Sequence, residues 1–545
     1  MKIQKPGNTA VIDPKDATVT TAGAPATDEQ KRLKHLISRR HPKYADFLEH
    51  WSFLEQTYEG GREWFKDHIF RYIKEGDQEF KERRQRAYRF NHTREVVDLL
   101  NKYLFKQHIT RNETDAPESV KRFWAQSTKN GLGIRDFARQ ASKKASVAGR
   151  IGVVVDNNAA PGAVISKADE KKAGVRTYAY IVGPKQLLDY SFDENGELNW
   201  ALILESARDD ADPMESSGDE RPRYRLWTKT DWLLLEESGK GGKKQVKIVG
   251  RGAHKLDEVP VILHDNIISD EDYIVPSLID DIAYLDRATA NYLSNLDAII
   301  QDQTFSQLAM PAQNVMPGDD NYNTLLNMGT KRVFLYDGES GVQPHYLSPD
   351  PKQAQMILAV INKIINEIYH TVGLAGERTK QDNAVGIDNS SGVAKAYDFE
   401  RVNALLQAKA DSLEAFENKL ARLVAKWNGE DGKITKDLVT YPDDFDTRGL
   451  YDEFDIAARL MLVQAPDAVR RHQMETVIDK LFPQLAEDLK KTMLDELKGW
   501  PIDPIEQAAE MAKATAVAAP KAGDQPAKSP AGQGSVKKDT PAKKD

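Results

Sequence analysis

The hydrophobic pattern is most regular between residues 353 and 427, where two helical repeats flank a polar stretch. Residues 391–428 predict one long helix, capped by Ser391 and stopped at Asn428-Gly429. At 1.5 Å per residue, a helix of about 38 residues is about 57 Å long. Its apolar positions recur at spacings of three and four: Val402, Leu405, Leu406, Leu413, Phe416, Leu420, Leu423, Val424 and Trp427. Lys409 and five other charged residues occupy the remaining faces. Such a helix also fits an ordinary globular domain, so its neighbours must define its role.

Two further helices are predicted on either side of an irregular segment. Residues 276–303 predict a helix with an apolar stripe on one face and acidic residues on the opposite face. Residues 351–373 predict a second helix, with Asp350 as its N-cap and Pro351 in its first turn. The acidic positions are Asp280, Asp281, Asp286, Asp297 and Asp302. We therefore expect one helix to leave the body of the protein and the other to return.

The segment between these helices, residues 304–350, loses the helical pattern. Lys331 to Tyr336 and Val342 to Leu347 flank Asp337-Gly338 and predict two short strands in a small α/β insertion. Lys331 and Arg332 are the basic candidates in this insertion.

A polar, glycine-containing loop follows at residues 374–390. A loop of this length without periodicity is usually functional or disordered. Its candidate functional residues are Arg378, Lys380, Gln381, Asp382 and Asn383.

The remaining segments predict a multi-domain α+β protein. Residues 29–149 read as helices, 150–265 as an antiparallel β-rich region, and 429–504 as a helical cluster. Residues 1–28 and 505–545 have few large apolar side chains, so we expect flexible arms. Within the helical part, Phe80, Arg83, Ala87 and Asn91 recur at helical spacing. The basic run from Lys81 to Arg94 is interleaved with glutamates, which favours a solvated helix face over a nucleic-acid patch.

Composition narrows the class of protein. The chain has 545 residues, of which 40% are hydrophobic and 29% charged, as expected for a soluble protein of several domains. It contains no apolar run of about 18 residues and no N-terminal signal pattern, so we expect synthesis in the cytosol and no membrane span. A net charge of -8 argues against a broad basic surface that grips nucleic acid, yet it permits DNA to slide past.

Motifs for catalysis or cofactor binding are missing from the sequence. There is no cysteine, which removes disulfides, thiolate nucleophiles and cysteine-ligated metals. The eleven histidines form no H-E-x-x-H pair, no G-x-S-x-G elbow occurs, and Gly131-Leu132-Gly133 lacks the third glycine of a dinucleotide fingerprint. We expect no catalytic residue, no metal and no cofactor, and hence no enzyme.

The order of these segments resembles the portal proteins of tailed double-stranded DNA bacteriophages over about residues 30–500. Three sequence features carry the resemblance: Tyr58-x-Gly60-Gly61, Arg83-x-x-x-Ala87-x-x-x-Asn91, and Asn389-Ser390-Ser391-Gly392-Val393-Ala394-Lys395 at the start of the long helix. The last of these is the most specific.

The resemblance implies a role for each segment. Residues 29–275 would form the wing, 276–303 and 351–373 the two stem helices, and 304–350 the clip. Residues 374–390 would be the tunnel loop, 391–428 the long wing helix, and 429–504 the crown. The five loop residues would face DNA, and the five aspartates would line the channel or a subunit interface.

A portal protein forms a dodecameric ring at one capsid vertex, through which DNA is packaged and ejected and to which terminase and tail or adaptor proteins dock. The partners implied are further copies of the chain, double-stranded DNA, the major capsid protein, the terminase large subunit and a tail or adaptor protein, with a scaffold protein left open. The expected location is the portal vertex of the virion, after synthesis in the host cytoplasm.

Two other functions remain open from the residues alone. One is a head–tail adaptor or minor capsid protein that contacts the vertex without forming the DNA tube. The other is a metal-dependent nuclease or hydrolase that uses clustered carboxylates, although no ordered acidic motif follows a predicted strand.

Overall fold

The computed structural model describes the larger part of the chain in two compact units, Met1–Asp446 and Thr447–Asp545. The described residues are 27–158, 175–210, 212–238, 245–304, 307–311, 333–336, 343, 345–347, 352–374, 392–443, 445, 457, 460, 466–482, 487–498 and 500. The arm predicted at 505–545, and the one at 1–28 up to residue 26, lie outside the described residues.

The N-terminal part is helical, as predicted, with one short strand, β1 (Thr110–Arg111). Its helices are α1 (Thr27–Ser38), α2 (Tyr44–Glu59), α3 (Trp64–His68), α4 (Asp77–Arg86), α5 (His92–Leu104), α6 (Glu118–Ala125) and α7 (Ile134–Ala148). The helical spacing from Phe80 to Asn91 does not mark one helix. Instead, α4 ends at Arg86, and the Asn91 side chain accepts a hydrogen bond from Arg94 N and so caps α5.

Two antiparallel sheets follow, in agreement with the predicted β-rich region. One has the order β3-β2-β9, from β2 (Arg150–Asn157), β3 (Thr177–Val182) and β9 (Val261–Asp265). The other is a meander of β4 (Leu187–Phe192), β5 (Leu198–Arg208), β6 (Glu220–Thr228), β7 (Asp231–Ser238) and β8 (Gln245–Ala253). The region was predicted only as a whole, and sequence periodicity does not reveal β4 or β9 as separate strands. Four consecutive residues of β4 are buried, so the strand has no apolar–polar alternation to detect.

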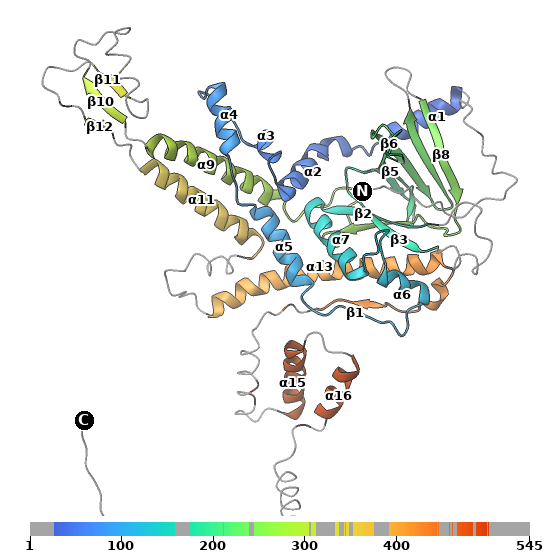
Figure 1. The fold of residues 1–545 in the computed structure, drawn as a ribbon. Helices are drawn as coiled ribbons and strands as arrows, with labels where there is room; N and C mark the ends of the chain where they lie inside the picture. The colour runs from blue at the N-terminus through green and yellow to red at the C-terminus, as the bar shows by residue number, and fades with distance from the viewer. Residues whose placement is uncertain are drawn as a thin grey trace, which may run out of the picture. The chain divides into compact units, whose positions relative to one another are not determined.

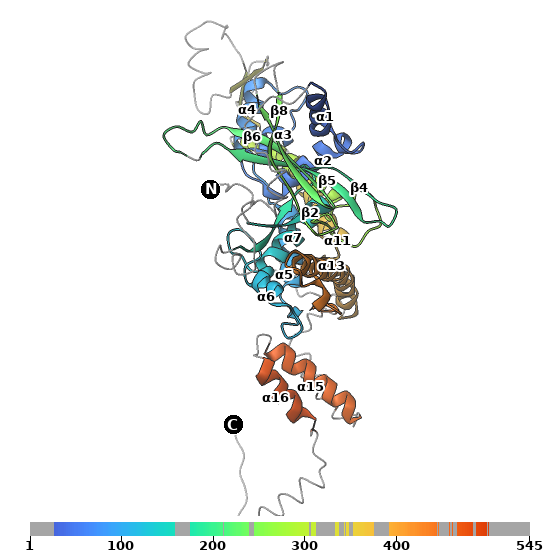
Figure 2. The same ribbon diagram turned by 90° about the vertical axis from the view of Figure 1, so that its right-hand side faces the viewer.

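Three long helices organise the rest of the first unit (Figure 1). They are α9 (Asp280–Thr304), α11 (Lys352–Thr371) and α13 (Gly392–Trp427), close to the predicted bounds. The chain leaves along α9 and returns along α11, and the two helices pack against each other. Figures 1 and 2 show α13 beside α5, α6 and α7, where Leu406, Leu413 and Phe416 are buried in the largest hydrophobic core.

A small sheet lies between α9 and α11 in sequence. It consists of β10 (Gln307–Pro311), β11 (Val333–Tyr336) and β12 (His345–Leu347), with β10 in the centre, parallel to β11 and antiparallel to β12. The two strands predicted around Asp337-Gly338 correspond to β11 and β12. They pair with β10 rather than with each other, and no turn signal in the sequence marks β10 off from the preceding helix.

The boundary after the long helix differs from the prediction. Residues 429–446 belong to the first unit, because β13 (Val439–Thr440) pairs with β1 and Tyr441 and Phe445 are buried in the same core as α13. A short 3-10 helix, η2 (Asp431–Lys433), precedes β13. The described part of the second unit contains α15 (Asp467–Leu481) and α16 (Glu487–Leu497), and Arg471 Nε donates to the carbonyl oxygen of Trp500 at 2.6 Å.

Candidate functional site: the α9–α11 helix pair

The α9–α11 pair joins the body of the first unit to the small sheet and to the polar loop. The five loop residues predicted to face DNA, Arg378 and residues 380–383, lie outside the described residues, and so do Lys331 and Arg332. What the structure describes is how the two helices that carry these segments are held.

The five aspartates of α9 do not form one exposed acidic face. Asp281 is exposed, but Asp280 accepts a hydrogen bond from Ser277 N and lies 2.9 Å from His50 Nε2. Asp297 lies 3.4 Å from Arg86 Nε. The side chain of Asp302 lies outside the described residues. Three of the aspartates, Asp286 among them, therefore contact N-terminal helices of the same chain.

Asp286 contradicts the expectation most clearly, because its side chain is fully buried. Its Oδ2 accepts hydrogen bonds from Thr93 Oγ1 at 2.8 Å and Thr93 N at 3.2 Å, and lies 3.7 Å from Arg89 Nη1. Burial raises the pKa of the Asp286 carboxyl, while Arg89 and Thr93 act in the opposite direction. Asp286 thus fixes α9 to α5 and cannot line a channel or a subunit interface.

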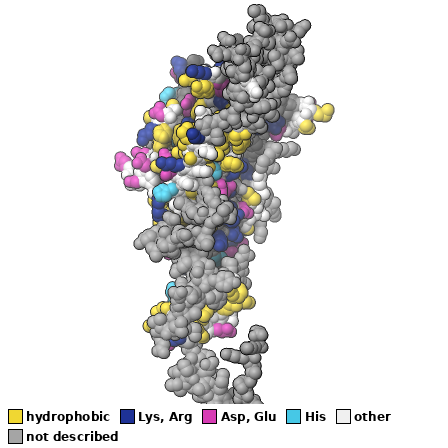
Figure 3. All heavy atoms as spheres, turned by 90° about the vertical axis from the view of Figure 1, so that its left-hand side faces the viewer, with side chains coloured by type: hydrophobic (Ala, Val, Ile, Leu, Met, Phe, Trp, Pro, Cys, Tyr) yellow, Lys and Arg dark blue, Asp and Glu magenta, His cyan; other side chains and the backbone are white. Residues whose placement is uncertain are grey.

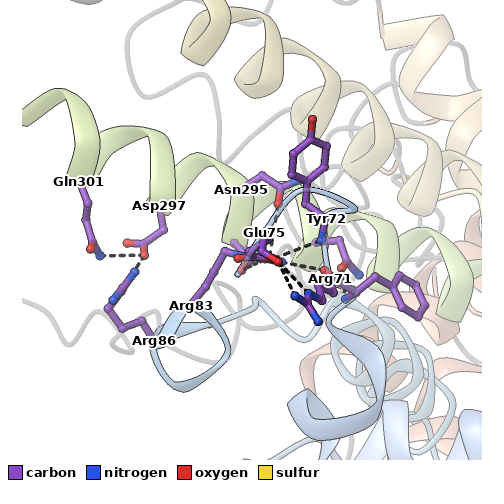
Figure 4. A network of polar contacts seen from close by, with 11 residues as sticks. Arg71, Tyr72, Glu75, Arg83, Arg86, Asn295, Asp297 and Gln301 are labelled. Carbon is purple, nitrogen blue, oxygen red and sulfur yellow. Dashed lines mark hydrogen bonds and ion pairs between the residues drawn. The ribbon is translucent and has the colours of Figure 1, made fainter. Parts of the chain in front are cut away.

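A second buried ion pair fixes α4 and its preceding loop to α9 (Figure 4). Arg83 binds Glu75 through two hydrogen bonds, Nε to Oε1 at 2.7 Å and Nη2 to Oε2 at 2.8 Å. The same guanidinium donates to Phe70 O at 2.7 Å and to Ser294 Oγ on α9 at 2.9 Å. The hydrogen bonds from Arg83 hold the pKa of Glu75 below its usual value. We call Arg83, Glu75 and Ser294 the Arg83 clamp.

The prediction of a solvated face for the basic run from Lys81 to Arg94 is therefore wrong for two of its arginines. Arg83 is buried in the clamp, and Arg89 stacks over the Trp64 ring at 4.1 Å beside Asp286. A charge pattern along one helix reports spacing only, so it could not reveal carboxylates supplied by other elements.

The returning helix, α11, is tied to α5 at its C-terminal end. Tyr369 OH donates to Glu95 Oε2 at 2.6 Å and lies 3.2 Å from His92 Nδ1. The chain then turns at Gly373, as predicted, with a φ of 76°, and a Cβ there would lie 3.2 Å from Arg401 Cβ. Helix α5 therefore contacts both α9 and α11 and sets their position on the body.

Sequence reasoning also missed the role of Lys409, which it placed on a polar face of the long helix. The side chain is buried, and Nζ donates to Ser146 Oγ at 2.7 Å and to Asn266 Oδ1. Burial lowers the pKa of Lys409 to about 7. The sequence does contain a sign of this burial. Lys409 follows Leu406 by three residues and precedes Leu413 by four, which puts it on the buried stripe of the helix.

The part of the chain that the structure describes contains neither a membrane-spanning helix nor a cluster of metal ligands. None of its helices has both the length and the apolar character needed to cross a membrane. Within the same residues, no cluster of three or more His, Asp or Glu side chains could hold a metal ion.

Comparison with known protein families gives a match over most of the chain. A profile of the family described as "Phage portal protein, SPP1 Gp6-like" matches residues 42–441. No curated protein matches the chain. Two solved structures that resemble it are described as "Neck of empty GTA particle computed with C6 symmetry" and "Virion of native gene transfer agent (GTA) particle". Each is 13% identical, covers 74% of this chain and 89% of the other, and has a TM-score of 0.34.

Proposed function

Because the chain belongs to the SPP1 Gp6-like family of phage portal proteins, we propose that twelve copies form a closed ring at one vertex of a viral capsid. Portal proteins are structural proteins rather than enzymes. The ring would be the conduit for DNA during packaging and ejection. It would also be the platform where the terminase large subunit, the major capsid protein and a tail or adaptor protein dock.

The observation that carries this proposal is the extent of the family match. Residues 42–441 begin before α2 and end just after β13, so they include both sheets, α9, the small sheet, α11 and α13. A match of this extent covers the helix–sheet–helix excursion as well as the body of the first unit. It supports the proposal for nearly all of the first unit rather than for one of its parts.

Within the ring, we assign α9 and α11 to the stem, the β10–β12 sheet to the clip, residues 374–390 to the tunnel loop and α13 to the long wing helix. Residues that follow Thr447 would contribute to the crown. Arg378, Lys380, Gln381, Asp382 and Asn383 would face DNA. A conduit with few basic side chains suits this role, because each lysine or arginine on phosphate adds counterion-release affinity that would slow DNA passage.

Electron microscopy of the purified protein tests the proposal. We expect end-on views of a twelve-fold ring with an axial hole wide enough for a DNA duplex, about 20 Å or more. A compact assembly without an axial hole would contradict the conduit and favour a head–tail adaptor. A monomer at all protein concentrations would contradict ring formation itself.

A further inference from the structure

The five-stranded sheet ends at β8, and the described residues cover the outer edge of this strand only in part. Gln30 Nε2 donates to Val246 O at 2.8 Å, and Val246 N donates to Gln30 Oε1 at 3.2 Å. The side-chain amide of Gln30 thus takes the place of one peptide group of a further strand. Ile248 directs its N–H and C=O to the same side, because alternate residues of a strand face the same neighbour. No described residue forms a hydrogen bond with these two groups of Ile248.

Three other sheet edges of the first unit are covered by groups from neighbouring elements. Leu188 O on β4 accepts from His41 N at 3.0 Å, and Ala179 N on β3 donates to Ser127 O at 2.7 Å. Asp265 O on β9 accepts from Ser412 Oγ at 2.6 Å. An open edge is a template for pairing with another chain, so proteins usually cover it. The edge of β8 beyond Val246 therefore needs a partner that supplies backbone groups.

Helix α1 begins beside this edge. Gln30 lies one turn after Thr27, the first residue of α1, and the helix then crosses the sheet to β4, where Arg39 Nε lies 2.6 Å from Asp189 Oδ2. Figure 1 shows α1 beside β8. The 26 residues that precede Thr27 therefore join the described fold at the uncovered edge of β8.

The sequence just before α1 contains a segment suited to a strand. Residues 18–21 are Thr-Val-Thr-Thr, four β-branched and uncharged residues in succession. Residues 22–26 join them to α1 and contain Gly23 and Pro25, which favour a turn. Five residues span at most about 17 Å when extended, and Thr27 lies about 4.5 Å along the helix from Gln30. The segment can therefore reach β8 of its own chain.

The direction of the chain also fits. Residues 17–21 lead toward Thr27 and hence toward Val246, whereas β8 runs away from Val246. The segment would therefore be antiparallel to β8. Every neighbouring pair of strands in this sheet is antiparallel as well.

We propose that residues 17–21 pair with β8 of the same chain as a sixth, antiparallel strand of the sheet. For these residues, an ordered strand replaces the flexible arm expected from composition. The strand closes the edge of β8 against pairing with other copies. In contrast, the face of the molecule in Figure 3 mixes basic, acidic and hydrophobic side chains among its described residues, and this mixture selects no single partner.

Hydrogen exchange at the Ile248 amide tests the pairing. Deletion of residues 2–26 should make this amide exchange about tenfold faster or more, because its partner is removed. A triple variant that weakens strand formation should act in the same way: Thr18→Gly, Val19→Ser and Thr20→Gly. The matched control changes three residues farther from α1 and should leave exchange unchanged: Thr9→Gly, Ala10→Ser and Val11→Gly. Equal exchange at Ile248 in the full chain and in the deletion variant would overturn the proposal. Faster exchange in the control than in the triple variant would also overturn it.

Cysteine cross-linking tests whether the strand comes from the same chain, since the full chain contains no cysteine of its own. With a short bis-maleimide, the double variant Thr20→Cys, Ile248→Cys should give a link within one chain, detected by mass spectrometry of the monomer band. The control pair is Thr20→Cys with Lys34→Cys, because Lys34 is exposed on α1 and a freely moving segment would reach it as readily. The control pair should link far less.

Mixed variants give the decisive outcome. An equal mixture of the single variants Thr20→Cys and Ile248→Cys should give no linked dimers. Linked dimers would overturn the proposal, because the strand would then come from another copy, and equal linking of the control pair would overturn it as well. The contact lies within one chain, so either failure leaves the proposed ring untouched, and a failure of ring formation leaves this contact untouched.

Discussion

Buried charges determine how the first unit is held together at the level of single residues. Arg83 and Lys409 lie on helices and Arg89 between α4 and α5, in stretches whose patterns suggest exposure, yet each reaches polar partners on another element. Arg83 and Arg89 have carboxylates beside them, whereas Lys409 has only neutral acceptors. We therefore expect the arginine pairs and the lysine to respond differently to substitution and to pH.

Removal of Glu75 should loosen α4 and the loop that precedes it. Glu75→Ala leaves the Arg83 guanidinium buried without its carboxylate, which should destabilise this region by about 3 kcal/mol. Hydrogen exchange of the amides from Tyr72 to Arg83 measures the loss. Lys66→Ala is the control, since the Glu63–Lys66 pair is exposed and should contribute less than about 1 kcal/mol. Equal protection in the two variants would contradict the clamp.

Lys409 should make stability depend on pH above neutrality. Its pKa is about 7 when folded and about 10.4 when unfolded, so between these values the unfolded chain binds the extra proton. The contribution of Lys409 to the free energy of unfolding therefore rises as pH rises from about 7 to about 10. This contribution is lowest at pH 7 and below. Lys409→Met should remove that slope and raise the unfolding temperature most at pH 7.

Thermal unfolding at pH 7, 8 and 9 measures this effect. Lys419→Met, an exposed position on the same helix, is the control and should keep the slope of the unmodified protein. A slope that Lys409→Met leaves unchanged would show that Lys409 is charged in the folded protein.

At the level of elements, α13 serves as a support for segments far away in the chain. Its Asn418 side chain accepts hydrogen bonds from Leu438 N at 2.9 Å and Val439 N at 3.0 Å, and donates to Val439 O at 2.9 Å. The buried amide thus takes the place of a neighbouring strand for β13, whose other edge pairs with β1. One residue of α13 therefore fixes the segment that follows the long helix.

Asn418→Ala should detach β13 while α13 stays folded. Buried backbone groups at Leu438 and Val439 lose their partners, at a cost of about 3 kcal/mol for the segment. Limited proteolysis of residues 429–441 should become faster, as mass spectrometry would detect. Arg422→Ala, which breaks only the exposed pair with Asp437, should leave cleavage unchanged. Resistance of the Asn418 variant to cleavage would mean that β1 alone holds β13.

At the level of the whole molecule, the first unit combines a packed body with two helices, α9 and α11, that lead to the small sheet and back. Helix α5 contacts both α9 and α11, and α13 begins after the loop at 374–390. The residues between Leu374 and Gly392 are therefore flanked by two helices of the first unit. We expect the loop to be dispensable for folding and ring assembly, and to matter only for DNA.

Deletion of residues 377–387 tests that expectation. Rings should still assemble, because residues 377–387 belong to neither α11 nor α13, while DNA packaging or DNA retention in particles should fall. Replacement of the same residues by a Gly-Ser segment of equal length separates loss of side chains from loss of chain length. If packaging and retention are both normal in the two variants, the loop is not the part that contacts DNA.

Much of the element order could be predicted from the sequence. The helices at 276–303, 351–373 and 391–428 were found within a few residues, because each has an apolar stripe of the helical period and a recognisable cap. Strands β4 and β10 were missed, since neither shows alternation bounded by turn residues. The DNA-facing loop residues remain a prediction, because polar side chains in a loop carry no signal of direction.

The fold class, the order of the long helices and the resemblance to portal proteins could be predicted from sequence alone, because hydrophobic period and helix caps act locally along the chain. Which charges are buried, in contrast, becomes visible only once the elements are packed together. Asp286, Arg83 and Lys409 look alike in sequence to their exposed neighbours, and their partners Arg89, Glu75 and Ser146 come from other elements. A charge is buried or exposed according to what packs against it, and that depends on contacts far apart in the chain.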